Sequence, residues 1–183
     1  MRSNLGLLLA FITATGACAP SAGTVDPRSA TRATATLRDT AGAEVGVATF
    51  TQERDGVVRL EAEVTGLAPG AHGIHVHTTG SCDAAGATAF GAAGGHFNPT
   101  ARPHGLRHPQ GGHLGDLPNL DLGDDGRGEL RTTSTRFTLS PGAASLLDAD
   151  GSALVIHAGP DDQRTDPTGN SGGRIACGVV EPG

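Results

Sequence analysis

The residues best suited to chemistry lie in the stretch 70–77, which reads Gly-Ala-His-Gly-Ile-His-Val-His and holds three histidines within six residues. Side chains two residues apart on a β-strand project from the same face. His75 and His77 are therefore expected to point the same way, while Ile74 and Val76 point into a core. Two imidazoles aimed at one spot from a rigid strand make half of a metal site.

The other half of this site is expected among the remaining histidines. All eight histidines fall between His72 and His157, and such clustering is typical of metal binding. The candidate ligands are His75, His77, His96, His104, His113, Asp116 and His157. Imidazole suits copper and zinc, and a carboxylate among imidazoles suits zinc. These ligands are too many for one ion, whereas two ions can use them if one imidazole serves both.

The composition limits the class of protein. A chain of 183 residues is long enough for one domain with a real core. The formal charge is -6, and all 13 basic residues are arginines without a basic run, so nucleic acid is not an expected partner. The 29 glycines and the aromatic content of 3% favour short strands joined by many turns.

Strands are the elements expected to position the ligands. Apolar and charged residues alternate cleanly over 58–64, which is typical of a strand with one buried face and one wet face, and Asp55-Gly56 before it is a hairpin signal. Further strands are expected over 32–38, 44–51, 117–122, 128–134, 152–157 and 174–180, besides the histidine stretch. About eight strands with turn signals between them predict an all-β sandwich or barrel.

The segments without periodicity are expected to be loops. The two long ones, 78–115 and 159–173, carry histidines and other polar residues, and loops of this length normally need a functional reason or a staple. Residues 137–150 are expected to form a connection with room for one helical turn.

The N-terminus is expected to lie outside the folded domain. A short basic start is followed by an apolar run over 5–13 that is too short for a permanent membrane span, and small residues then precede Cys18. This pattern resembles a bacterial lipoprotein signal, and it predicts a signal peptide over 1–17, an acylated Cys18, a flexible tether over 18–31 and a domain over 32–183. An ordinary secretory signal, with Cys18 discarded, is the alternative. Both readings export the protein, to the periplasm or the outer cell envelope.

The cysteine count agrees with export. Three cysteines leave an odd one, and if Cys18 carries lipid or is cleaved off, Cys82 and Cys177 remain as a pair. In an oxidising compartment this pair is expected to form a disulfide.

Several motifs in order carry a family resemblance. They are residues 70–77, Gly-His-Phe-Asn-Pro at 95–99, His104, Gly-His-Leu-Gly-Asp at 112–116, Val-Ile-His at 155–157 with Asp161-Asp162, and Gly-Asn-Ser-Gly-Gly-Arg-Ile-Ala-Cys-Gly at 169–178. Together they resemble the bacterial exported branch of the copper–zinc superoxide dismutases. The resemblance implies a Greek-key β-barrel or sandwich with two long functional loops.

The resemblance also implies a role for each ligand. The copper ligands would be His75, His77, His96 and His157. The zinc ligands would be His96, His104, His113 and Asp116. His96 would bridge the two ions, and two cations acting on one ring make the loss of its second proton plausible.

Two further side chains have roles implied by the resemblance. Asp161 would bond the free nitrogens of His75 and His104, although its neighbour Asp162 could exchange roles with it. Arg174 would stand beside the open copper position and attract an anion. Copper would alternate between two oxidation states while superoxide is converted to oxygen and hydrogen peroxide.

Other readings stay open at this point. A non-catalytic copper- or zinc-binding module on the same fold is the alternative function, and the chain can act as a monomer or a homodimer. His72 is expected to be a barrel histidine bonded to backbone, and His108 a solvated loop residue. The loop 159–173 has no lysine, and Arg164 can substitute as a steering charge.

Overall fold

The computed structural model describes Met1 and residues 32–183, so the predicted signal peptide, tether and acylated Cys18 lie outside the described residues. The described strands are β1 (Arg32–Asp39), β2 (Glu44–Gln52), β3 (Val58–Val64), β4 (Gly70–His72), β5 (Ile74–His77), β6 (Leu120–Leu122), β7 (Gly128–Ser134), β8 (Ala153–His157), β9 (Arg174–Val179) and β10 (Glu181–Pro182). A short 3₁₀ helix, η2, covers Gly91–Ala93. Within the described residues, no helix is long and apolar enough to cross a membrane.

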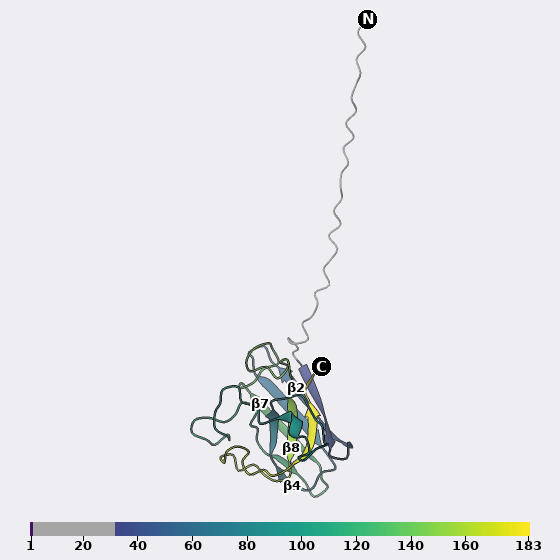
Figure 1. Ribbon diagram of the computed structural model, residues 1–183, viewed down its shortest axis with the longest axis vertical. Helices are drawn as coiled ribbons and strands as arrows, with labels where there is room; N and C mark the ends of the chain where they lie inside the picture. Colours follow the sequence, from purple (N-terminus) through teal and green to yellow (C-terminus); the bar gives the residue numbers. More distant parts are fainter. Residues whose placement is uncertain (2–31) are drawn as a thin grey trace.

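The strands form an antiparallel sheet curled into a half-barrel (Figure 1). The sheet order is β5-β8-β9-β1-β2-β3-β7, with β10 beside β1, and β4 pairs with β6 in a second, two-stranded sheet. The pairing of β10 with β1 sets the C-terminus beside the start of the domain. The predicted all-β antiparallel class is confirmed.

Strand β3 illustrates why these sequences form half-buried strands. Val58, Leu60, Ala62 and Val64 are buried in the core, while the charged residues between them lie at the surface. The turn that precedes β3 uses Gly56 at φ 86°, a left-handed conformation that favours glycine. The alternation of apolar and charged residues in β3 therefore matches the alternation of buried and more exposed side chains.

The histidine stretch is broken at Gly73 into two strands that pair with different partners. Strand β4 pairs with β6, whereas β5 pairs with β8. A Cβ added to Gly73 would lie 2.8 Å from the Cβ of Ser171, so the chain packs too tightly there for any side chain. All four residues of β5 are buried, with Ile74 and Val76 in the hydrophobic core. One face of β5 therefore packs in the core, and the other face is free to carry the two imidazoles.

Residues 137–150 form the predicted connection between β7 and β8, with turns and without a helical turn. The side chain of Gln52 on β2 accepts hydrogen bonds from Thr138 Oγ1 at 2.7 Å and from the Leu139 amide at 2.6 Å. Thr138 also forms a parallel bridge with Ser145. The Gln52 side chain thus fastens the start of this connection to β2.

The disulfide predicted between Cys82 and Cys177 is confirmed, and it spans 95 residues of sequence. It ties the start of the long loop after β5 to β9. Phe90, from the same loop, is buried against Cys177 in a small second cluster of apolar residues.

We expect the double variant Cys82→Ala/Cys177→Ala to unfold at markedly lower urea concentration than the wild type. Opening a loop of this length costs about 4 kcal/mol in the chain-entropy model, because the unfolded chain regains freedom. Urea unfolding followed by circular dichroism measures the change, with reduced wild-type protein as the control. An unfolding midpoint equal to that of the oxidised wild type would contradict a stabilising role for the bridge.

Candidate metal centre

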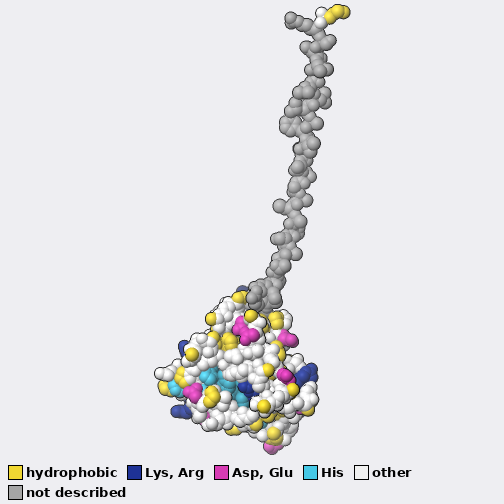
Figure 2. Space-filling view, viewed as in Figure 1, with side chains coloured by type: hydrophobic (Ala, Val, Ile, Leu, Met, Phe, Trp, Pro, Cys, Tyr) yellow, Lys and Arg dark blue, Asp and Glu magenta, His cyan; other side chains and the backbone are white. Residues whose placement is uncertain are grey.

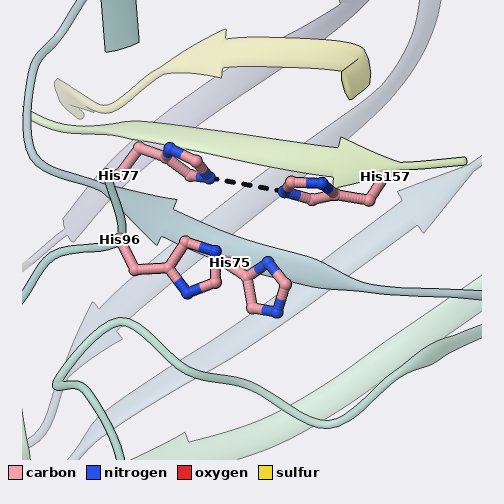
Figure 3. Close-up of side chains that lie close together, drawn as sticks. All are labelled: His75, His77, His96 and His157. Atoms are coloured by element: carbon pink, nitrogen blue, oxygen red, sulfur yellow. Dashed lines mark hydrogen bonds between the residues drawn. The ribbon is translucent and has the colours of Figure 1, made fainter. Parts of the chain in front are cut away.

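The first cluster contains four buried histidines. His75 and His77 come from β5, and His157 ends β8. His96 comes from the long loop after β5, where its backbone forms an isolated antiparallel β-bridge with His77. One ring nitrogen from each of the four lies within 4.8 Å of the others. The Nε2 atoms of His77 and His157 are 3.5 Å apart, and the rings of His75 and His96 stack at 3.9 Å (Figure 3).

Hydrogen bonds on the outer side of this cluster set the direction of each ring. The Nδ1 atom of His77 lies 3.0 Å from the carbonyl of Gly94, and Nδ1 of His157 lies 3.1 Å from that of Gly172. A carbonyl only accepts, so each Nδ1 must donate its proton outward and each Nε2 must keep its lone pair for the inside. The histidines are therefore held in the tautomer that a metal ion requires.

The second cluster is built around one buried carboxylate. Asp116 Oδ1 lies 3.0 Å from His96 Nδ1, 3.1 Å from His104 Nδ1 and 3.3 Å from His113 Nδ1. Its other oxygen accepts the backbone N–H groups of Gly105 at 2.7 Å and His113 at 2.8 Å. These two N–H bonds fix the carboxylate, so that its free oxygen faces three imidazoles at once.

His96 belongs to both clusters. Its Nδ1 faces Asp116 in the second cluster, and its Nε2 is the atom it offers to the first. Asp161 adds a second link, because Oδ2 lies 2.7 Å from His75 Nε2 and Oδ1 lies 3.0 Å from His104 Nε2. Asp162 is exposed instead and bonds Thr165, so Asp161 is the carboxylate that holds the two histidines.

Burial keeps the histidines of the first cluster neutral. It lowers the pKa of His75 to about 3 and that of His157 to about 4, because a charged ring would lose its hydration. The pKa of His77 falls well below its usual value for the same reason, and that of His96 is also lowered. Neutral imidazoles have lone pairs available, so the cluster is ready to bind a cation at neutral pH.

The carboxylates of the site stay ionised despite their burial. Burial alone would raise the pKa of Asp116, but its contacts with three histidines and its N–H bonds hold that pKa far below the usual range. The bonds of Asp161 to His104 and His75 likewise depress its pKa. Burial opposes protonation of His104, yet its two carboxylate neighbours outweigh burial and raise its pKa to about 9.

Arg174, the first residue of β9, is fixed beside the first cluster. Its guanidinium donates to the carbonyls of Phe90 and Gly94, both at 2.5 Å, and the Gly94 carbonyl is the one that also accepts from His77. The residue is half-buried, and burial lowers its pKa. Figure 2 shows histidine side chains reaching the surface of the domain in one area, with a basic side chain beside them.

The remaining sequence predictions for this region concern two histidines. The interpretation of His72 is confirmed, because its two ring nitrogens lie 2.8 Å from the His157 carbonyl and 2.9 Å from the Ala68 carbonyl. His108 lies in the loop and belongs to neither cluster among the described residues. Its Nδ1 accepts from the amide of Gln110.

Three residues that support the site were missed at the sequence level. Asn119 bonds both the N–H and the carbonyl of Asp161 at 2.9 Å, and Arg136 donates to the carbonyl of Asp116 at 2.5 Å. Gln163 bonds the segments beside the second cluster. All three act on backbone atoms of distant segments, so their residue types and spacing carried no signal.

The atoms left unpaired inside the site fit a pair of metal ions. Within residues 32–183, His75 Nδ1 and His96 Nε2 are buried without a hydrogen-bond partner. A buried unsatisfied polar atom costs about 1–3 kcal/mol, so two in one place indicate a missing partner. Four imidazoles suit copper, and three imidazoles with a carboxylate suit zinc.

Comparisons with known proteins agree with this chemistry. Residues 44–180 match the family model of copper/zinc superoxide dismutase. The chain is 45% identical over 157 residues to a Cu-Zn superoxide dismutase of Deinococcus radiodurans, covering 80% of this chain and 82% of the relative. It is 43% identical over 142 residues to Cu-Zn superoxide dismutase 1 of Aquifex aeolicus, covering 76% and 82%.

A solved structure of a similar protein has the same fold. The crystal structure of a SOD-like protein from Bacillus subtilis matches with a TM-score of 0.73 at 37% identity, covering 80% of this chain and 96% of that one. The chain therefore belongs to the copper/zinc superoxide dismutase family. Copper and zinc are its cofactors, which agrees with the donor sets of the two clusters.

We expect His157→Ala and His113→Ala to separate the two ions. Each change removes a nitrogen from one cluster only, so each variant should retain one metal ion per chain and lose most of the other. Elemental analysis of purified, metal-loaded protein gives the result, with His108→Ala as the matched control that retains both. Loss of both metals from His157→Ala, in a protein that keeps its β circular dichroism, would contradict the division into two ions.

Proposed function

We propose that this protein dismutates superoxide to oxygen and hydrogen peroxide, with copper held by His75, His77, His96 and His157 and zinc held by His96, His104, His113 and Asp116. The observation that carries the proposal is the shared ring of His96, which offers Nε2 to one donor set and Nδ1 to the other. Bound copper would supply one-electron redox chemistry, whereas bound zinc would have no redox role.

The protein's own groups would prepare both donor sets. The carbonyls of Gly94 and Gly172 hold His77 and His157 with Nε2 directed inward. Asp161 accepts from His75 and His104, which fixes their rings and increases their basicity. The Nε2 atom of His96 could hold one proton whenever no metal ion occupies it.

Arg174 would attract the substrate, which is an anion. The formal charge of the whole chain is -6, so the net charge repels superoxide and a local cation is needed at the site. The charge of Arg174 is close enough to depress the pKa values of His77 and His157. Its two bonds to backbone carbonyls stop it from swinging into solvent or collapsing onto the imidazoles.

We expect purified, metal-loaded protein to accelerate superoxide decay, and Arg174→Ala to be slower by roughly tenfold or more at low salt. Metal content should be unchanged, and the salt dependence of the rate should weaken. Pulse radiolysis or stopped-flow mixing measures the decay, and Arg131→Ala, an exposed change on β7, is the control. Full copper and zinc content with no acceleration would favour a non-catalytic metal-binding module, and an unaltered rate for Arg174→Ala would remove its steering role.

The location of the protein is the second part of the proposal. The N-terminal pattern supports export, a lipid on Cys18 and a tether over 18–31, which would let the domain act in the periplasm or outer cell envelope and protect it from superoxide. A disulfide is also typical of an oxidising compartment.

Cys18→Ala is expected to shift the protein from the membrane fraction to the soluble exported fraction, because the acylated residue would be gone. Fractionation of the cells that express the full chain measures this shift. Membrane association that persists in the variant would argue against lipidation, while a wild-type protein that is already soluble would favour an ordinary secretory signal.

A further inference from the structure

Gln163 is a buried polar residue in an unusual backbone conformation. It lies in the loop between β8 and β9, is only 6% exposed and has φ 65°, in the left-handed region that a non-glycine residue rarely adopts. Such a conformation persists only where the surrounding contacts enforce it. The contacts of Gln163 show what enforces it.

Three hydrogen bonds of Gln163 run to segments beside the second cluster. Its side-chain Oε1 accepts from the Leu106 amide at 3.3 Å, and its own carbonyl accepts from the Arg107 amide at 3.1 Å. Its Nε2 donates to the carbonyl of Leu117 at 3.1 Å. Leu106 and Arg107 closely follow His104, and Leu117 directly follows Asp116. One residue therefore fastens the chain just after two members of the cluster.

The backbone of Gln163 also packs against the cluster from outside. Its N–H donates at 2.6 Å to Asp161 Oδ1, the same oxygen that faces His104 Nε2. Gly105 lies between Asp116 and Gln163. Its N–H donates to the Asp116 carboxylate, while its α-carbon packs on the Gln163 peptide. A Cβ on Gly105 would lie 2.1 Å from the Gln163 carbonyl oxygen, so the two backbones pack too closely for any side chain at position 105.

We propose that Gln163 is a positioning residue for the zinc site, which holds His104 and Asp116 at their binding positions before the ion arrives. The inference rests on the zinc ligands of the proposed function. Gln163 does not touch the ion. It removes the freedom of the segments 104–107 and 116–117, so the ion meets ligands that are already in place and less ordering accompanies binding.

The test compares zinc affinity in chains stripped of metal. Zn²⁺ is titrated against a chromophoric competing chelator into wild type, Gln163→Ala, Gln163→Gly and the control Gln110→Ala, an exposed glutamine in the same loop as His104. We expect a loss of roughly 10–100-fold in affinity for both Gln163 variants, the range typical of residues that support a metal ligand, and no change for the control. Glycine adopts φ 65° freely, so an equal loss in Gln163→Gly assigns the effect to the side-chain amide.

Two further readouts separate this role from a structural one. If Gln163 merely stabilises the fold, the thermal midpoint of the metal-free variants falls while zinc affinity stays at the wild-type value, and that result would overturn the proposal. Co²⁺ bound in place of zinc should show altered visible bands in Gln163→Ala, because its ligands are less well placed. Wild-type protein that binds no zinc refutes the ligand assignment itself, whereas normal wild-type binding with unchanged variants refutes Gln163 alone.

Hydrogen exchange on the wild type keeps the proposal testable if the variants do not fold. The amides of Leu106 and Arg107 donate to Gln163, so in the metal-free wild-type protein they should exchange at least tenfold more slowly than the exposed amides of the same loop. Exchange of both amides at the rate of an unprotected peptide would contradict a cluster that is held in place before metal binds.

Discussion

The structure depends on one constraint, which is that a single imidazole serves two donor sets deep inside a small β protein. His96 takes part in both clusters, so six histidines and two carboxylates must be placed together away from water. Burial of these groups is costly unless each one has a partner. The carboxylates of Asp116 and Asp161 and the carbonyls of Gly94 and Gly172 supply partners on the outside of the clusters. The unpaired nitrogen atoms remain on the inside, where the donor sets suit metal ions.

The fold meets this constraint by combining rigid strands with tightly fastened loops. Strands β5 and β8 pair in the sheet and carry three of the histidines, while loops supply the other three and both carboxylates. A loop can hold a ligand only if it has lost its freedom. The disulfide, the bonds of Arg174 to the loop carbonyls and the contacts of Asn119, Arg136 and Gln163 provide that restraint. The carbonyl of Gly94 connects the first cluster with the nearby cation, since it accepts hydrogen bonds from both His77 and Arg174.

Much of this arrangement follows from the sequence because the relevant signals are local. The alternation in residues 58–64 predicts β3 with its burial pattern, and the seven candidate ligands are recognised by type and order. Other features depend on contacts between distant segments and leave no local trace. The break at Gly73 reflects crowding by Ser171, and the path of residues 138–139 depends on Gln52. Gln163 has no distinguishing feature in the sequence, because its role depends on partners such as Leu117. Sequence patterns therefore identify candidate ligands better than they identify the residues that position those candidates.

Electron paramagnetic resonance of Cu²⁺ tests the shared ring most directly. Spectra are compared for protein that carries copper alone, for the same protein after zinc is added, and for His113→Ala treated in the same way. If His96 links the two ions, zinc should change the copper spectrum of the wild type by drawing on the same imidazole, and His113→Ala should show little change. A wild-type copper spectrum that stays the same while one zinc ion binds per chain would contradict the account.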